Sequence, residues 1–428
     1  MRSKLIASAA ALAVASLVLA GCSTGGPSSD DKTLTLWHYE GADSAMGKAW
    51  DAAITTFEKE TGAKVKFEEK SFEQIRSTAS QVLNSNAAPD ILEYNKGNAT
   101  AGLLASQGLL MNLDDAVAKY GWDKKLAPSL QTTAKYNDKG VMGSGSFYGI
   151  PNYGEFTMMY YNQDLFDQYG IAIPTDMDSF EAALAAFKAE GVTPLAESAA
   201  EYPLGQLFYQ LALSKADRQF VNDYQLYDNP VDWKGPELTY AAETIKDWVD
   251  KGYISTDASG LKAEDAGVSF INGTSPMFYS GSWWYGRFQT EVKFNWTSGL
   301  YPDGTLTPGS SGNIWVIPAN SKHADLAEKF IDVTMRPEIQ AIIGNNGGVP
   351  VAANAADITD PKSQELIANF NTVTGQDGLS FYPDWPTSTF YDQLNAALQE
   401  LVNGTKSPSE VLSELGTEYK DGVAEITG

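Results

Sequence analysis

An alternation of strand-like and helix-like segments near the amino terminus constrains the fold of this chain most strongly. Short apolar or alternating segments at residues 34–36, 64–68 and 88–94 predict three strands. The two segments between them repeat apolar residues with helical spacing and predict two helices. This order is typical of a parallel sheet with crossover helices, so we expect an α/β fold.

The loops that follow these strands are the first places to expect a ligand. Ligands of open parallel sheets sit beyond the carboxyl ends of the strands. The relevant loops are residues 37–41, which are rich in aromatic side chains, and residues 94–98.

The length of the chain predicts more than one core. Later segments continue the mixture of strands and helices without a fixed period, which argues against a solenoid. About 400 residues are too many for one compact core, so two lobes are expected.

The first residues have the pattern of an export signal. Arg2 and Lys4 precede a small and apolar run at residues 5–19, which is shorter than a membrane-spanning helix needs. The run ends in Leu-Ala-Gly before Cys22, the only cysteine, and this ending resembles a bacterial lipobox. We therefore expect cleavage after residue 21 and a lipid on Cys22.

The residues after Cys22 predict a tether. Gly, Ser and Pro dominate residues 22–32, and such a composition favours a flexible linker over a packed structure. The folded part is thus expected outside the cytoplasm, held at the cell membrane by its lipid alone.

Charge and composition exclude several classes of partner. Removing residues 1–21 takes away Arg2, Lys4 and no acid, so the formal net charge falls from −24 to −26. Such a charge argues against binding nucleic acid or anionic lipid headgroups. With only His38 and His323 and no Cys/His cluster, we expect no metal site and no cofactor.

Aromatic residues point to a sugar as the ligand. The chain has 10 Trp and 21 Tyr, and flat rings can cover the apolar faces of a pyranose while carboxylates bind its hydroxyls. The segments 37–40 and 382–385 each combine rings with a carboxylate.

Six short motifs make the resemblance to a known family specific. Their order and spacing resemble those of the extracellular solute-binding proteins that serve sugar importers of the ATP-binding-cassette (ABC) type, the maltose- and oligosaccharide-binding group in particular. The motifs lie at residues 34–37, 88–91, 148–151, 159–166, 277–283 and 347–350, and the resemblance covers nearly the whole mature chain.

This resemblance implies a two-lobed binding protein whose hinge the chain crosses three times. Each lobe would be a mainly parallel sheet flanked by helices. The first lobe would comprise residues 33–150 and 300–347, and the second lobe residues 151–299 and 348–428. The implied partners are a sugar, with an oligosaccharide favoured, and ABC permease subunits, and the protein itself would be a monomer.

The resemblance also implies ligand-binding residues. Tyr94 takes the place of a sugar-facing tryptophan, Glu155 that of a glutamate that accepts sugar hydroxyls, and Glu201 and Tyr202 that of a Glu-Tyr pair. Trp283 matches a stacking tryptophan, although serine replaces the proline that normally precedes it.

Two positions stay open. The acidic residue of the first loop is Glu40 or Asp43, and the last aromatic contact is Trp385, next to Asp384, or Phe390. The complete set of expected ligand-binding residues is Trp37, Tyr39, Glu40, Tyr94, Glu155, Glu201, Tyr202, Trp283, Asp384 and Trp385.

Two alternatives compete with a sugar-binding protein. A secreted glycoside hydrolase would use two carboxylates, but the sequence contains no nucleophile elbow, phosphate loop or metal cluster, and we expect no catalytic residue. The same fold could instead bind a peptide, a polyamine or a metal ion, since cationic ligands suit an acidic protein.

Overall fold

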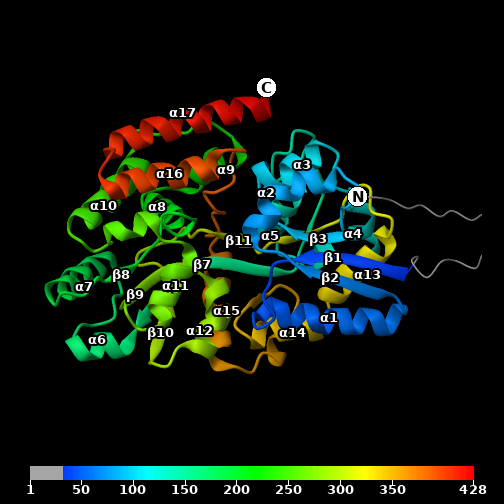
Figure 1. Ribbon diagram of the computed structural model, residues 1–428, viewed down its shortest axis with the longest axis horizontal. Helices are drawn as coiled ribbons and strands as arrows, with labels where there is room; N and C mark the ends of the chain where they lie inside the picture. Colours follow the sequence, from blue (N-terminus) through cyan, green and yellow to red (C-terminus); the bar gives the residue numbers. More distant parts are fainter. Residues whose placement is uncertain (1–31) are drawn as a thin grey trace, which may run out of the picture.

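Two α/β lobes lie next to each other in a computed structural model that describes residues 32–428 (Figure 1). The expected signal peptide, Cys22 and all but the last residue of the expected linker lie outside the described residues. In Figure 1 the first lobe, mostly blue and cyan, occupies the right half, and the second lobe, mostly green and red, occupies the left.

The first lobe is built on a five-stranded sheet with the order β2-β1-β3-β12-β6. As the sequence predicts, β1 pairs in parallel with β2 and β3, whereas β12 is antiparallel to β3 and β6. The strands are β1 (Thr33–His38), β2 (Lys64–Glu69), β3 (Ile91–Tyr94), β6 (Ile150–Pro151) and β12 (Ile314–Val316), with a separate ribbon of β4 (Lys135–Tyr136) and β5 (Ser146–Phe147).

Helices cover both faces of this sheet. The first of them begins at a cap in which the Ser44 hydroxyl accepts a hydrogen bond from the backbone N–H of Gly47, and it ends at Gly62 in the left-handed conformation. The helices are α1 (Ala45–Thr61), α2 (Phe72–Leu83), α3 (Leu103–Ser106), α4 (Asp114–Tyr120), α5 (Pro128–Gln131), α13 (Ala324–Thr334) and α14 (Pro337–Asn345).

The second lobe is organised around one long buried strand, β7. Along it, Met159 and Tyr161 face one core cluster, while Met158 and Tyr160 face another, so both sides of the sheet are covered. The strands are β7 (Tyr153–Asn162), β8 (Leu195–Ala196), β9 (Met277–Gly281), β10 (Trp296–Gly299), β11 (Gly309–Ser311) and β13 (Val349–Pro350).

The expectation of a mainly parallel sheet is wrong for the second lobe. Only β8 and β9 pair in parallel, whereas β9, β10, β11 and β13 are all antiparallel to β7. The reason is that β7 enters from the first lobe. Strand β7 follows β6 after a single residue and not after a helix packed on the second sheet. A helical crossover is what makes two neighbouring strands parallel, so parallel pairing with β7 is not expected.

The helices of the second lobe include the carboxyl-terminal ones. They are α6 (Gln163–Tyr169), α7 (Met177–Ala189), α8 (Pro203–Leu213), α9 (Arg218–Leu226), α10 (Pro236–Asp250), α11 (Ala263–Ile271), α12 (Tyr285–Glu291), α15 (Pro361–Gly375), α16 (Phe390–Asn403) and α17 (Pro408–Thr427).

We propose that three connections within residues 32–428 join the lobes and form the hinge. They run from β6 to β7, from β11 to β12, and from α14 to β13. Residues 300–311 were expected in the first lobe, but Tyr301 and Leu306 pack in the main core of the second. We therefore propose a middle crossing near residue 312 instead of residue 300.

Candidate ligand-binding cleft

A cavity of about 620 Å³ lies between the lobes, and segments far apart in the sequence form its walls. This volume falls within the range of ~300–1,000 Å³ that is usual for small-molecule sites.

The first lobe contributes loops at the carboxyl ends of its parallel strands. Tyr39 and Glu40 follow β1, Asn95 and Lys96 follow β3, and all four line the cavity. The carboxyl ends of parallel strands lie at one edge of a sheet. The two loops that the sequence singles out therefore reach the same cavity.

The second lobe contributes Glu155 on β7, Glu201 and Tyr202 before α8, and Trp283 after β9. The indole N–H of Trp283 donates a hydrogen bond to the hydroxyl of Tyr202 over 3.2 Å, and their rings meet edge to face. This contact fixes the orientation of the tryptophan in the wall. Glu201 accepts a hydrogen bond from the backbone N–H of Ala263, 3.0 Å away, which holds it at the rim.

A third wall comes from the segment between α15 and α16. It places Tyr382, Asp384 and Trp385 in the lining. The indole of Trp385 stacks on the ring of Tyr391 with a centroid separation of 4.9 Å, and its carbonyl accepts a hydrogen bond from the Ala99 N–H of the first lobe. This segment of the second lobe is thereby attached to the first.

Eight of the ten expected residues line this cavity. They are Tyr39, Glu40, Glu155, Glu201, Tyr202, Trp283, Asp384 and Trp385. The structure thus brings together residues that the sequence separates by more than 300 positions.

Trp37 and Tyr94 lie elsewhere, because both are still within their strands. Tyr94 ends β3 and is buried in a core cluster of the first lobe. Trp37 precedes the last residue of β1, and its ring packs under the ammonium group of Lys70 at 4.7 Å. Of the two open alternatives, exposed Asp43 does not line the cavity, and Phe390 is fully buried in the core of the second lobe.

The charges in the cleft are mostly negative, with one buried cation among them. Lys96 forms an ion pair with Glu155, and its ammonium nitrogen lies 4.8 Å from the ring centroid of Tyr382. Burial raises the pKa of Asp384 to about 7, with Lys96 opposing and Glu155 adding to this rise. Burial likewise raises the pKa of Glu40 to about 7, and the charge of Glu155 adds to it.

Tyr153, which lines the cleft, connects Glu40 to one further buried carboxyl group, that of Glu93. The hydroxyl of Tyr153 lies 3.4 Å from an oxygen of Glu40 and 3.1 Å from an oxygen of Glu93. Burial, followed by the charge of Glu40, raises the pKa of Glu93. The second oxygen of Glu93 has no hydrogen-bond partner among the described residues.

Reasoning from the sequence named the loop 94–98 and the segment 382–385 but did not single out Asn95, Lys96 or Tyr382 within them, and it missed Gln206 altogether. A signal existed for the first two, because they follow immediately after the last residue of a predicted strand. No comparable signal marks Gln206, which is 4% exposed and lies within α8, a helix whose residues are all buried.

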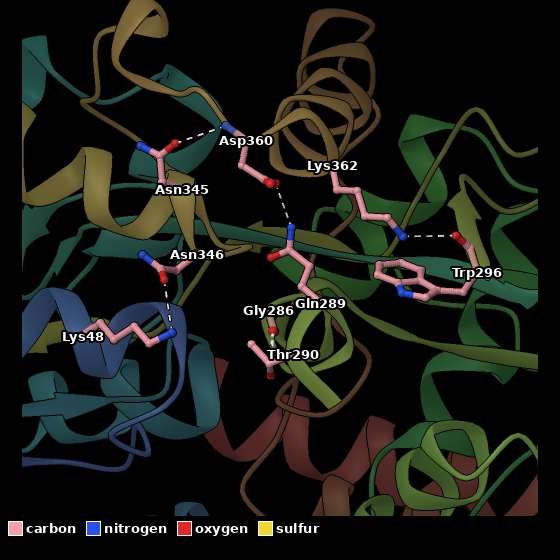
Figure 2. A pocket seen from close by; sticks show the side chains of 9 residues that line it. All are labelled: Lys48, Gly286, Gln289, Thr290, Trp296, Asn345, Asn346, Asp360 and Lys362. Atoms are coloured by element: carbon pink, nitrogen blue, oxygen red, sulfur yellow. Dashed lines mark hydrogen bonds between the residues drawn. The ribbon is translucent and has the colours of Figure 1, made fainter. Parts of the chain in front are cut away.

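A second pocket of about 300 Å³ lies between α1 of the first lobe and α12 and α15 of the second (Figure 2). Its polar groups bind one another. Lys48 donates a hydrogen bond to Asn346 over 3.1 Å, and Gln289 donates one to Asp360 over 2.8 Å. The ammonium of Lys362 lies 3.5 Å from the centre of an indole ring in the wall. None of the expected ligand-binding residues lines this pocket.

Within residues 32–428, no three or more His, Cys, Asp or Glu side chains are grouped so that they could hold a metal ion. The same part of the chain contains no helix with the length and apolar character to cross a membrane.

A family model described as "bacterial extracellular solute-binding protein" matches residues 52–371. Two curated relatives match over essentially their whole length. They are the diacetylchitobiose binding protein DasA of Streptomyces coelicolor and a maltooligosaccharide ABC transporter solute-binding lipoprotein of Streptococcus pneumoniae, each 24% identical. The matches cover 99% and 100% of this chain and 100% of each relative.

Another relative matches over a shorter region. A probable sugar-binding periplasmic protein of Brucella suis is 30% identical over 190 residues, which is 43% of this chain. The match spans 42% of that relative's length.

Solved structures share the fold. A chitin oligosaccharide binding protein is 22% identical with a TM-score of 0.77, and the match covers 92% of this chain and 99% of the other. An ABC substrate-binding protein from Listeria monocytogenes in complex with cycloalternan is also 22% identical, with a TM-score of 0.74 and the same coverage. The two-lobed α/β architecture is therefore that of the periplasmic binding proteins.

Proposed function

Because this chain belongs to the bacterial extracellular solute-binding protein family, we propose that it captures an oligosaccharide between its lobes for an ABC importer. Its partners in this role are the permease subunits of that importer, to which the loaded protein delivers the sugar. The family is one of transport proteins without catalytic activity, so the hydrolase alternative is dropped.

The observation that carries this proposal is the chemistry of the interlobe cavity. Rings from both lobes face it together with carboxyl and amide groups, a combination that matches the apolar faces and hydroxyl rim of a pyranose. The relatives whose names mention diacetylchitobiose and maltooligosaccharide support a sugar over a peptide.

Each part of the wall has a proposed role. Trp283 and Trp385 cover faces of sugar rings, and Tyr39 and Tyr202 provide further aromatic edges. Glu40, Glu155 and Glu201 hydrogen-bond to hydroxyl groups, together with the amide of Asn95, and Asp384 accepts a hydrogen bond from another donor group of the sugar.

The proposed location follows from the leader sequence. We infer that Cys22 carries the lipid anchor and that residues 22–32 tether the binding lobes to the membrane. One full-length relative is named a lipoprotein, which supports this assignment.

The proposal is tested by titrating the purified mature chain with a panel of oligosaccharides in a calorimeter. At least one sugar should bind, and Trp283→Ala should weaken that binding by about 10–100-fold, because an aromatic platform contributes about 1.5–3 kcal/mol. Phe67→Ala is the matched control, since Phe67 is an exposed ring on β2 outside the cleft.

Two results contradict the proposal. One is the absence of binding to every sugar, and the other is a spermidine or peptide affinity above that of all sugars. An unchanged sugar affinity in Trp283→Ala would instead contradict the assignment of that residue to the site.

A further inference from the structure

The cleft has more buried carboxyl groups than basic groups to neutralise them. Three ion pairs account for all the basic residues in the lining: Lys96 with Glu155, Lys262 with Glu201, and Arg287 with Glu264. Two acidic side chains of the lining then remain without a basic partner within 4.0 Å among the described residues. They are Glu40, from the first lobe, and Asp384, from the second.

Asp384 has one carboxylate oxygen without a hydrogen-bond donor among the described residues. The residue is 4% exposed, and the unpartnered oxygen is Oδ1. The amide of Gln206 lies beside Asp384 and lowers its pKa through a side-chain hydrogen bond. Gln206 is equally buried, and its Oε1 atom is likewise unpartnered among the described residues. A buried acceptor without a donor costs about 1–3 kcal/mol. The unpartnered oxygens of Asp384 and Gln206 therefore favour a ligand with more than one hydrogen-bond donor.

Aromatic rings near the same wall suit a positive charge. The ammonium of Lys96 lies over the ring of Tyr382, whose hydroxyl is also unpartnered among the described residues. The cleft therefore already accommodates one ammonium group against a ring, an arrangement that stabilises cations in desolvated sites.

We propose that the sugar recognised by this protein carries a protonated amine, and that Asp384 and Gln206 bind this amine. The inference rests on the proposed function, because it concerns the same cleft. An ammonium group brings three hydrogen-bond donors and one positive charge. It would therefore supply donors to the unpartnered oxygens and neutralise the carboxyl group of Asp384. The donor shortage is met less well by a hydroxyl, which brings one donor and no charge.

The alternatives fit these residues less well. A sugar with a carboxylate would add another negative charge beside Glu155 and Asp384. A divalent metal bridging sugar and protein would need several ligands, and residues 32–428 contain no group of three or more acidic, His or Cys side chains placed to hold one.

Proton linkage distinguishes an amine from a neutral sugar. Asp384 is faced by Lys96 and Glu155, and the phenols of Tyr224 and Tyr391 feel its charge. The pKa of Asp384 is raised to about 7, so part of this carboxyl group is protonated at neutral pH. Binding of an ammonium ligand that keeps Asp384 ionised will therefore release protons from the protein. A neutral sugar that buries it further will take up protons instead.

The test uses matched oligosaccharides that differ only at C2, where they carry a hydroxyl, an acetamide or a free amine, in α- and β-linked series. In whichever linkage series binds, the oligosaccharide with the free amine should bind at least tenfold more tightly at pH 7 than those with the hydroxyl or the acetamide. Calorimetry in buffers of different ionisation enthalpy should show proton release for the amine alone.

Variants identify the residue responsible. Asp384→Asn should reduce the preference for the amine to threefold or less, whereas Asp250→Asn, which removes the same charge on the exposed side of α10, should preserve it. Gln206→Leu is the second variant, and it should also reduce the preference, so the test does not depend on the folding of one substitution.

The outcomes separate the two proposals. Equal binding of all three C2 forms, or proton uptake with the amine, overturns the amine inference and leaves the sugar-binding function standing. Failure of every sugar to bind, with or without spermidine binding, overturns the proposed function itself.

Discussion

At the residue scale, Tyr153 lies between two carboxyl groups that would repel each other if both were ionised at neutral pH. Its single hydroxyl proton can serve either Glu40 or Glu93, but only one at a time. Burial raises the pKa of both acids, the charge of Glu155 adds to both rises, and the charge of Glu40 raises the pKa of Glu93 further. Because two like charges on the same hydroxyl are unfavourable, ionising one of these acids makes it harder to ionise the other.

This arrangement predicts a pH-dependent effect of Glu40→Gln. An acid with a raised pKa stabilises the fold most below its unfolded pKa, and this contribution is lost as pH rises through the folded pKa. For Glu40 the window runs from 4.5 to about 7. Relative to the wild type, the variant should gain stability between pH 5 and pH 8, reaching about 1–3 kcal/mol at pH 8.

Urea unfolding followed by tryptophan fluorescence at several pH values measures this gain. Glu264→Gln, which removes an equal charge from the rim, is the matched control. A difference between Glu40→Gln and the wild type that stays constant from pH 5 to pH 8 would contradict the raised pKa.

Individual residues also show how much of the candidate site can be predicted from the sequence. Glu155 and Trp283 could be named from motifs, because Glu155 stands seven residues before Asn162 of one motif and Trp283 ends another. Tyr94 could not, because the choice between it and Lys96 depends on the residue at which β3 ends. Asp384 could be named from its aromatic neighbours, but the side chain that lies beside it, Gln206, is 178 positions away in the sequence.

At the element scale, helix α12 lies very close to the end of α14, and this contact fixes the position of one wall of the cleft. Gly347, just beyond α14, has a φ of +82°, and a Cβ there would lie 2.5 Å from the Cα of Gly286 in α12. Helix α12 follows Trp283 directly and contributes Arg287 to the cleft. A shift of this helix would therefore move one wall of the ligand site.

Gly347→Ala should therefore destabilise the protein and weaken ligand binding. The positive φ alone costs a residue with a Cβ about 1–2 kcal/mol, and the clash with backbone atoms adds to this. We expect a loss of about 2–4 kcal/mol in unfolding free energy and a loss of at least threefold in sugar affinity.

Gly404→Ala separates the two contributions. Gly404 has a φ of +70° but no atom within 4 Å of an added Cβ, so this variant should show the conformational cost alone and bind sugar normally. Equal losses of stability in the two variants, measured by urea unfolding, would mean that the contact with α12 contributes nothing.

Elements of the first lobe are more predictable than those of the second. The pattern of residues 34–94 contains its own crossover helices, so local spacing determines the parallel pairing of β1, β2 and β3. Strand β7 is recognisable from its apolar run, but its four antiparallel neighbours come from segments up to nearly 200 positions away. No local pattern carries that information.

At the scale of the whole molecule, the proposed export and lipid anchoring would depend on residues 1–32, which precede the folded lobes. Cys22→Ser should remove the lipid and release the protein from cells into the medium. Because residues 22–32 precede the lobes, its sugar affinity should equal that of the unmodified mature chain. Immunoblots of membrane and medium fractions, with titration of the released protein, measure both properties. Retention of the variant in the membrane would argue against lipidation at this cysteine.

The two lobes are held together around the cleft by contacts that a ligand can reinforce. Lys96 of the first lobe pairs with Glu155 on β7, and Arg76 of α2 forms an ion pair with Asp392 of α16 over 3.4 Å. A ligand that touches both walls binds the closed arrangement better than an open one, and this difference in affinity is what shifts the population. The predicted consequence is a change in overall shape.

Saturating sugar should therefore reduce the radius of gyration measured by small-angle X-ray scattering, from a starting value of about 21 Å or more for a chain of this length. Trp283→Ala at the same sugar concentration should scatter like the ligand-free protein, since its loss of affinity leaves the cleft empty. Raising the concentration of sugar should then restore the compact form of the variant, because the substitution removes binding energy and leaves the hinge connections unchanged. An unchanged radius in the saturated wild type would mean that sugar enters a cleft that is already closed, and capture would then have to depend on transient opening.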